Sequence, residues 1–404
     1  MAQTLARSDE TEGETMKMTT QFRSRDRADA AKPVLARRQI KLALVAASVL
    51  FSNGVFADNV NSDDATSAAT RYPIILVHGV AGTDKIGFGE VGADTLNPLD
   101  ILSNLDKAIG IYWYGMVQPL RDHGATVYTA TLSSWESDAV RGDELYKAVQ
   151  QVEMITGAKK VNLIAHSQGG QASRIVAALH PDEVASITTI AAPLRGAPLS
   201  DDVGTLLSAV QKLPGGSLLV DAVLFALNAS GFITNLVSGF ALPQDALGAQ
   251  KSLSSAGSAE LNQQLDASLA PGSASGLGAD CKTSGAAYED RQVTVSGQST
   301  PATYRTLLYS WTGKGGPVGS YTNLSFPLGF VVGNLLGIAS QLNTGESDGL
   351  VPVCSARFGS IISTDYLWNH ATEVNQPLGL KNYNTADPVT VLLNQARRLK
   401  ADGV

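Results

Sequence analysis

The stretch VNLIAHSQGG, residues 161–170, decides the fold more than any other part of the chain. Its first residues are mostly apolar and predict a short buried strand, and the small and aliphatic residues of 169–179 predict a helix. A sharp turn between a strand and a helix lifts the side chain at the turn, Ser167, out of the sheet. The same turn places the backbone N–H of Gln168 at a helix N-terminus, where negative charge is favoured. The stretch therefore predicts a nucleophilic serine, with Ala165 in the place of the usual first glycine.

Further strands and helices alternate around this motif. Apolar runs predict strands at 73–77, 125–130, 184–190 and 306–311. Helical patterns separate most of them, so we expect a parallel sheet with helices on both faces. The predicted class is α/β, with one domain over residues 71–404 and no internal repeat.

Two helices have recognisable boundaries in the sequence. One ends at Gly157 and carries apolar residues at helical spacing, namely Leu145, Val149, Val152 and Ile155. The other is the terminal helix, which begins with Asp387 as N-cap and Pro388 in the first turn. Residues 200–270 are also expected to be helical, and 271–300 to form a loop rich in glycine and serine.

The N-terminus predicts export. A mostly apolar run of ten residues, 42–51, follows the basic residues Arg37, Arg38 and Lys41. This apolar run is too short to span a bilayer, and Val55-Phe56-Ala57 fits a cleavage site, so we interpret 1–57 as a signal peptide. The unusually long start suggests that translation begins at Met16 or Met18. An uncleaved anchor is the alternative. Residues 58–70 are predicted to be a polar leader, and the protein to be secreted through the periplasm.

Composition excludes one large class of function. The chain has 404 residues, a net charge of −7 and 17% charged residues. We find no basic cluster beyond the first 41 residues, so nucleic-acid binding is not expected. The only two cysteines, Cys281 and Cys354, predict one disulfide in an exported protein, with two free thiols as the alternative.

A nucleophilic serine needs a base and a carboxylate that orients the base. In the order serine, acid, histidine, only His180 and His370 follow Ser167. His180 ends the helix that leaves the serine turn and should point away from the site, so elimination favours His370. Asp348 lies in an Asp-Gly turn before an apolar run and is the preferred acid, with Asp365 as the rival.

The oxyanion of an acyl-transfer reaction needs N–H donors. Residues 78–79, His-Gly, directly follow the first predicted strand. Gly79 lets the chain turn there. We therefore expect the Val80 N–H to join the Gln168 N–H as the second donor.

These residues resemble a known family, the secreted bacterial true lipases typified by enzymes of Pseudomonas and Burkholderia. The matching strings are YPIILVHG (72–79), AGTDK (81–85), WYG (113–115), KVNLIAHSQGG (160–170), YSW (309–311), SDGLV (347–351), WNH (368–370) and EVNQ (373–376). The resemblance spans roughly 71–400. It implies the α/β-hydrolase fold, triacylglycerol hydrolysis, a disulfide matching Cys281–Cys354 and a mobile helical lid, and often a membrane-anchored foldase with type II secretion.

The sequence departs from this family at its calcium site. The family holds a structural calcium ion near the catalytic histidine with two aspartates and two carbonyls, and the carbonyl positions correspond to Gln376 and Leu380. One aspartate position is Thr372 here, and the only acid between Trp311 and Asp348 is Glu346. Calcium prefers carboxylate oxygens, so we predict that the calcium is lost and that no cofactor is needed. Glu373 follows Thr372 and would point the other way if the segment were a strand.

Two further expectations concern substrate access. The apolar segment of about 200–245 is interpreted as a lid whose apolar face opens onto lipid, with a buried cap as the alternative. The segment 86–112 is longer than in most relatives and is expected to border the oxyanion side. The predicted function is a secreted serine carboxylic-ester hydrolase acting on acylglycerols at an oil–water interface; the alternative is an esterase or polyester depolymerase with the same machinery.

Overall fold

The computed structural model describes residues 64–83, 112–295, 299–315, 345–376, 379 and 385–404. The predicted signal peptide, most of the segment 86–112 and Leu380 lie outside the described residues. The strands are β1 (Ile74–Val77), β2 (Val127–Ala130), β3 (Val161–His166), β4 (Val184–Ile190), β5 (Tyr288–Val293), β6 (Ala302–Gly313) and β7 (Ser360–Tyr366).

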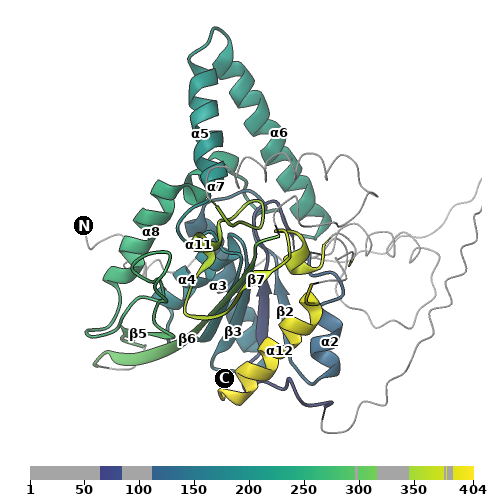
Figure 1. Cartoon of the computed structure of the whole chain (residues 1–404), viewed down its shortest axis with the longest axis vertical. Coiled ribbons are helices and arrows are strands. Elements are labelled where there is room, and N and C mark those ends of the chain that lie inside the picture. Colours follow the sequence, from purple (N-terminus) through teal and green to yellow (C-terminus); the bar gives the residue numbers. More distant parts are fainter. Residues whose placement is uncertain (1–63, 84–111, 296–298, 316–344, 377–378, 380–384) are drawn as a thin grey trace, which may run out of the picture. The chain divides into compact units, whose positions relative to one another are not determined.

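These strands form one mostly parallel sheet in the order β2-β1-β3-β4-β6-β5, and β7 also pairs with β6 (Figure 1). Only the β5–β6 pair is antiparallel among the described strands. Strand β6 is long enough for β5 to pair with residues 302–307 and for β7 to pair with residues 309–313. The α/β prediction is confirmed, but the expectation of a loop over 271–300 was wrong at β5. Burial alternates along β5, but its buried positions are the charged residues Glu289 and Arg291, so the sequence shows no apolar alternation there.

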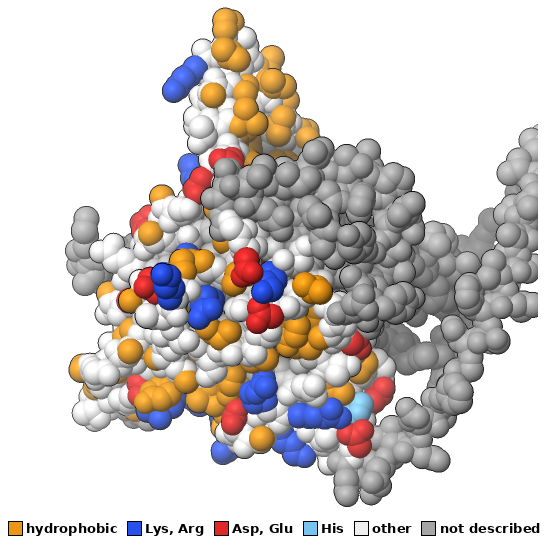
Figure 2. All heavy atoms as spheres, in the orientation of Figure 1, with side chains coloured by type: hydrophobic (Ala, Val, Ile, Leu, Met, Phe, Trp, Pro, Cys, Tyr) orange, Lys and Arg blue, Asp and Glu red, His pale blue; other side chains and the backbone are white. Residues whose placement is uncertain are grey.

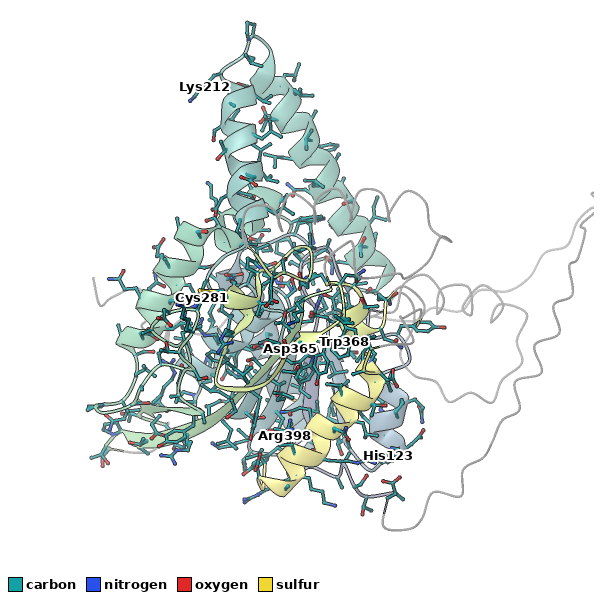
Figure 3. All side chains as sticks on the ribbon, viewed as in Figure 1. His123, Lys212, Cys281, Asp365, Trp368 and Arg398 are labelled. Carbon is teal, nitrogen blue, oxygen red and sulfur yellow. A yellow bond between two sulfur atoms is a disulfide. The ribbon has the colours of Figure 1, made fainter. Side chains whose placement is uncertain are left out.

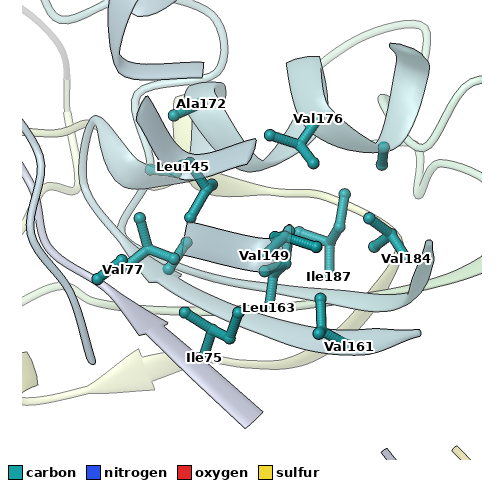
Figure 4. Close-up of a cluster of buried hydrophobic side chains, with 14 of the residues drawn as sticks. Ile75, Val77, Leu145, Val149, Val161, Leu163, Ala172, Val176, Val184 and Ile187 are labelled. Carbon is teal, nitrogen blue, oxygen red and sulfur yellow. The ribbon is translucent and has the colours of Figure 1, made fainter. Parts of the chain in front are cut away.

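Helices cover both faces of the sheet. Their bounds are α2 (Val117–Asp122), α3 (Asp138–Thr156), α4 (Gly169–Leu179), α5 (Pro198–Gln211), α6 (Gly216–Val237), α7 (Ala246–Leu253), α8 (Ser255–Ala267), α11 (Val353–Ala356) and α12 (Pro388–Ala401), with a 3₁₀ turn η1 (Thr372–Val374). Strand β1 shows why two layers are needed, since its side chains alternate between the faces. Ile75 and Val77 join the core beneath α3 and α4 (Figure 4), whereas Ile74 and Leu76 join the core beneath α2 and α12.

Helix α3 follows its predicted pattern except at its end. Leu145, Val149 and Val152 are buried, and Gly157 terminates the helix with a φ of 70°. Ile155 was expected on the same buried face, but it is 70% exposed.

The segment Asp64–Thr70, expected to be part of a polar leader, packs against the domain. Ala68 is fully buried, and Asp64 accepts a hydrogen bond from Arg397 of α12 at 2.7 Å. Asp64 also lies 3.2 Å from His123, which follows α2. These contacts join the start of the described chain to the two helices on one face of the sheet.

Helices α5 and α6 form a hairpin that extends away from the sheet (Figure 1). Apolar side chains lie on much of its surface (Figure 2), and Lys212 lies near its tip (Figure 3). The segment Gly216–Leu236 is long and apolar enough to cross a membrane, with a mean hydropathy of 1.6 in a window of which only 17% is buried. A core helix of that composition would be mostly buried, so this helix presents its apolar surface to its surroundings.

Candidate active site

The turn after β3 presents Ser167 at the carboxyl edge of the sheet. Ser167 has a φ of 55°, the left-handed conformation that a side-chain-bearing residue adopts only at a cost. The backbones on each side pass so closely that a Cβ at Gly169 would lie 2.8 Å from the carbonyl oxygen of His78. A Cβ at Gly170 would lie 2.5 Å from the Cβ of Ala192. The small residues of the motif are therefore required by the close packing of β3, α4 and their neighbours.

A hydrogen-bond chain connects Ser167 to an acid. The Nε2 atom of His370 lies 3.0 Å from the Ser167 Oγ, and its Nδ1 atom lies 2.7 Å from the Asp348 Oδ2. The other oxygen of Asp348 accepts the N–H groups of Leu350 and Val351 at 2.8 and 2.7 Å. This network assigns the Nδ1 proton to His370 and leaves Nε2 to accept the hydroxyl proton of Ser167.

The rival acid lies elsewhere. Asp365 is near the end of β7 (Figure 3), exposed, and paired with Lys314 at 2.6 Å. His180 caps the end of α4 and stacks on Tyr146, with ring centroids 3.5 Å apart. The structure thus brings Asp348 and His370 to Ser167 and places Asp365 and His180 away from it.

Two backbone N–H groups beside Ser167 have no acceptor among the described residues, those of Val80 and Gln168. The groups around Val80 are paired. The guanidinium of Arg141 donates to the carbonyl oxygens of His78 and Gly79 at 2.6 and 3.3 Å, and the Ala81 N–H donates to Ser134 at 2.7 Å. Two free donors next to a nucleophile can hold an anionic oxygen.

The side chain of Gln168 points away from this opening into the protein. Its amide donates to the Glu136 carbonyl at 2.8 Å and to the Asp138 carboxylate at 2.9 Å. Burial raises the pKa of Asp138 to about 6, opposed by the hydrogen bond from Gln168. The contact fixes the residue whose N–H faces the site.

Comparisons with known proteins match this geometry. Residues 72–316 match the family model described as the alpha/beta hydrolase fold. The chain is 38% identical over 359 residues to a triacylglycerol lipase of Pseudarthrobacter phenanthrenivorans, covering 84% of this chain and 99% of the relative. It is also 38% identical to one of Burkholderia plantarii (84% and 88% covered) and 30% identical to one of Pseudomonas fragi (84% and 99% covered).

The chain belongs to the α/β-hydrolase family of bacterial lipases. The resemblance drawn from the sequence is confirmed, and so is the expectation of a carboxylic-ester hydrolase.

The lipase contains a buried acid that sequence reasoning placed wrongly. Glu373 was expected to point away from Thr372 on a strand, but both residues lie in the 3₁₀ turn η1 and both are buried. The Glu373 Oε1 accepts the Gly313 N–H, and its Oε2 lies 3.9 Å from the Nε2 of His166. Burial, together with the charge of Asp348, raises the pKa of Glu373 well above its usual range. A 3₁₀ turn has no period-two alternation, and no sequence signal separated it from a strand here.

The lipase loop that carries His370 is held by direct hydrogen bonds. The hydroxyl of Thr372 lies 2.7 Å from the Asn369 Oδ1, which also accepts the N–H groups of Ala371 and Thr372. Gln376 is described and donates to the Tyr112 carbonyl at 3.4 Å. Glu346, the other acid considered for calcium, lies 3.3 Å from Lys314. These groups are a poor fit to a calcium ion, because the neutral Thr372 hydroxyl is already hydrogen-bonded to Asn369 and Glu346 pairs with Lys314.

Donor atoms of His166, His370 and Glu373 lie within 4.8 Å of one another. A transition metal suits nitrogen ligands, but both ring nitrogens of His370 already contact Ser167 and Asp348. This cluster is therefore part of the catalytic arrangement.

Cys281 and Cys354 form the predicted disulfide, which closes a span of 73 residues. Cys354 lies in α11, six positions after Asp348. The bond ties the segment that follows the acid to a distant loop that contains Cys281 (Figure 3).

Proposed function

We propose that this lipase hydrolyses acylglycerols through an acyl-enzyme on Ser167. The observation that carries the proposal is the hydrogen-bond chain from Ser167 through His370 to Asp348. Beside it lie two backbone N–H donors, of Val80 and Gln168, for which the described part of the chain offers no acceptor. The names of its relatives support triacylglycerols as the substrate class.

In the first half-reaction, the Oγ of Ser167 attacks the ester carbonyl carbon while the Nε2 of His370 takes the hydroxyl proton. The carbonyl oxygen becomes an anion and accepts hydrogen bonds from the Val80 and Gln168 N–H groups. The carbon–oxygen bond to the alcohol then breaks, and His370 returns the proton to the leaving alcohol. Water next attacks the acyl-enzyme with His370 as base, which releases the fatty acid and restores Ser167. Asp348 holds the imidazole and stabilises its protonated form.

We propose that the α5–α6 hairpin is the lid. Its large apolar side chains are widely exposed, including Leu218 at 76% and Phe225 at 74%. The end of α6 contacts the surroundings of residues 78–82, which we call the oxyanion loop. The Asn235 Oδ1 accepts the Ser134 N–H at 3.0 Å, and the hydroxyl oxygens of Ser238 and Thr83 lie 2.5 Å apart. A lipid surface that covers the apolar face would therefore act on a helix that is joined to the site.

We further propose that the enzyme is exported by the signal segment 1–57, that a foldase and type II secretion assist it, and that it works without calcium. The basic and apolar pattern of the first 57 residues supports export. The direct hydrogen bonds between Thr372 and Asn369 support independence from calcium.

The central experiment compares wild-type enzyme with Ser167→Ala on emulsified triolein, emulsified tributyrin and a soluble p-nitrophenyl ester. We expect Ser167→Ala to lose at least about a thousandfold of kcat on all three while its Tm stays close to that of wild type, because the change removes only the nucleophile. Turnover by this variant within a thousandfold of wild type would refute the proposed mechanism. A wild-type enzyme active on the soluble ester but inactive on both emulsions would favour the esterase alternative.

A further inference from the structure

Gly79 lies against the nucleophile and against a tyrosine at the same time. A Cβ at this position would lie 2.6 Å from the Ser167 Cβ and 2.8 Å from the Tyr112 hydroxyl oxygen. The Gly79 N–H donates to that hydroxyl at 2.9 Å. Since Arg141 already binds the carbonyls on both sides of this residue, Tyr112 supplies the remaining partner for the backbone next to Val80.

We propose that Tyr112 is a positioning residue that holds the Gly79 peptide so that the neighbouring Val80 N–H faces the oxyanion. This inference rests on the proposed Ser167 mechanism and adds to it a residue 33 positions from Gly79 in sequence. Neither the composition of the YWYG segment nor its place in the chain indicates this role.

Tyr112 is itself held by the residue before the nucleophile. Its hydroxyl lies 2.6 Å from the Nδ1 of His166. Burial, and then the nearby His370, lower the pKa of His166 well below its usual range, so this imidazole is neutral and carries one proton. Burial also raises the pKa of Tyr112, so its hydroxyl keeps its proton.

These constraints give one consistent direction for the protons. Tyr112 accepts from Gly79 and donates to the Nδ1 of His166, which leaves the His166 proton on Nε2. That nitrogen lies 3.9 Å from the Glu373 Oε2. Glu373 lies in the 3₁₀ turn η1, which directly follows the loop that carries His370. A series of contacts therefore connects the oxyanion loop, the serine turn and the histidine loop. It runs from Gly79 through Tyr112 and His166 to Glu373.

The position of the hydroxyl also explains why its loss should affect the transition state. Without the oxygen, the Gly79 N–H has no acceptor among the described residues, and the His78–Gly79 peptide is held only from its carbonyl end, by Arg141. Loss of this restraint lets the next peptide, which carries the Val80 N–H, shift about Gly79 and misaligns a donor that acts only when negative charge develops. Substrate binding before that point does not use this donor, so kcat should fall while KM stays nearly constant.

The test is Tyr112→Phe, assayed with a soluble p-nitrophenyl ester below its solubility limit. The ring contacts with His78, Trp113 and His166, at centroid distances of 5.7, 5.7 and 5.6 Å, can persist in this variant. We expect a fall in kcat of about tenfold, smaller than the 10²–10³-fold loss from removing a donor outright. We expect KM to stay within about twofold and the acid limb of the pH profile to stay in place. Affinity for an alkylboronic acid, whose adduct on Ser167 imitates the tetrahedral intermediate, should fall by a similar factor.

Tyr114→Phe is the matched control, because it is the next tyrosine in the same segment and its hydroxyl has no hydrogen-bond partner among the described residues. We expect it to match wild type in kcat and in boronate affinity. Unchanged kcat in Tyr112→Phe would overturn the inference. A shift of the acid limb would also overturn it, since that would show Tyr112 acting through His370.

His166 offers a second measurement. In His166→Asn, the amide can occupy the place of Nδ1 and still bind Tyr112, whereas His166→Ala leaves no partner. We expect the asparagine variant to retain more than half of kcat and the alanine variant to lose about tenfold. Tyr112→Phe combined with His166→Ala should lose little more than either alone, because both remove one connection. Additive losses would contradict a shared role. If Ser167→Ala keeps its activity, the proposed mechanism fails; if it is inactive and Tyr112→Phe is normal, only this inference fails.

Discussion

The oxyanion loop, His78–Gly82, and the α5–α6 hairpin are held by different forces. In the loop, Arg141, Tyr112 and Ser134 pair with backbone groups on both sides of Val80. In the hairpin, α6 has a single charged residue, Asp221, and leaves Leu218 and Phe225 about three-quarters exposed.

The contrast separates two requirements of one reaction. A donor must be fixed before charge develops, because reorganisation during the reaction raises the barrier. A surface that meets lipid needs apolar area, and each large side chain left in water forgoes about 1.5–3 kcal/mol of burial energy. The loop is therefore expected to tolerate no change of geometry, whereas the hairpin should tolerate change except where a lipid surface is present.

The largest effect should come from the acid. Asp348→Asn should lower kcat by about 10⁴-fold, because the amide favours the wrong tautomer of His370. Asp365→Asn should stay within about twofold of wild type, since the exposed Asp365 side chain pairs with Lys314 and lies away from the site. Steady-state rates on a soluble ester measure both. The opposite ranking would move the acid to Asp365.

Loss of the disulfide should weaken the region that carries the acid. The Cys281–Cys354 bond closes a span of 73 residues, which corresponds to about 4 kcal/mol in the chain-entropy model. We expect Cys281→Ala combined with Cys354→Ala to lower the Tm clearly, with soluble-ester activity retained well below the new Tm. Thiol titration of unfolded wild type without reductant should detect no free thiol. An unchanged Tm in the double variant would show that the bond does not stabilise this region.

The free energy of unfolding should depend on pH through Asp138, the buried carboxyl that binds the side chain of Gln168. The Asp138 pKa is about 6 when folded against 3.8 for the ordinary group, so between these values the folded state binds more protons than the unfolded state. The contribution of protonated Asp138 to the free energy of unfolding is therefore complete below pH 3.8 and is lost as pH rises through 6. Asp138→Asn should gain stability relative to wild type across this window, by up to about 3 kcal/mol.

Denaturant titrations at several pH values measure this difference. Asp143→Asn is a suitable control, since Asp143 is an exposed residue of the same helix. The expected titration would be contradicted if the free energies of unfolding of wild type and Asp138→Asn differed by the same amount at pH 4 and at pH 7.

The hairpin should respond only at an interface. Leu218→Ser with Phe225→Ser should lower activity on emulsified triolein by about tenfold and leave soluble-ester activity unchanged, because it removes apolar area without touching the site. Met154→Ser with Ile155→Ser is the matched control, since these side chains are 83% and 70% exposed on α3. Equal losses on both substrates would show that the hairpin supports the fold instead.

The smallest expected effect is that of chelation. Direct hydrogen bonds between Thr372 and Asn369 hold the histidine loop, so EDTA should leave Tm and activity unchanged. A drop in Tm that added calcium reverses would show that carboxylates such as Glu346 or Glu373 form a site.

Local patterns in the sequence were sufficient where chemistry is local. The strand, turn and helix around Ser167 follow from small and apolar residues, and chain order with turn composition led to His370 and Asp348. The same patterns could not find β5, because its inward residues Glu289 and Arg291 are charged and satisfy each other at 2.7 Å. Glu373 and Tyr112 were missed for a related reason: their roles depend on partners more than 30 positions away, which no periodicity records.

The backbone of Ser167 links reactivity to stability in a way that substitutions can separate. A left-handed φ of 55° at a residue with a Cβ costs of order 1–3 kcal/mol. Alanine at this position keeps that cost and removes the hydroxyl, whereas glycine would remove both. The most stable residue at this position is thus glycine, which is inactive. Selection for hydrolysis therefore has to maintain Ser167, a residue that selection for stability alone would replace.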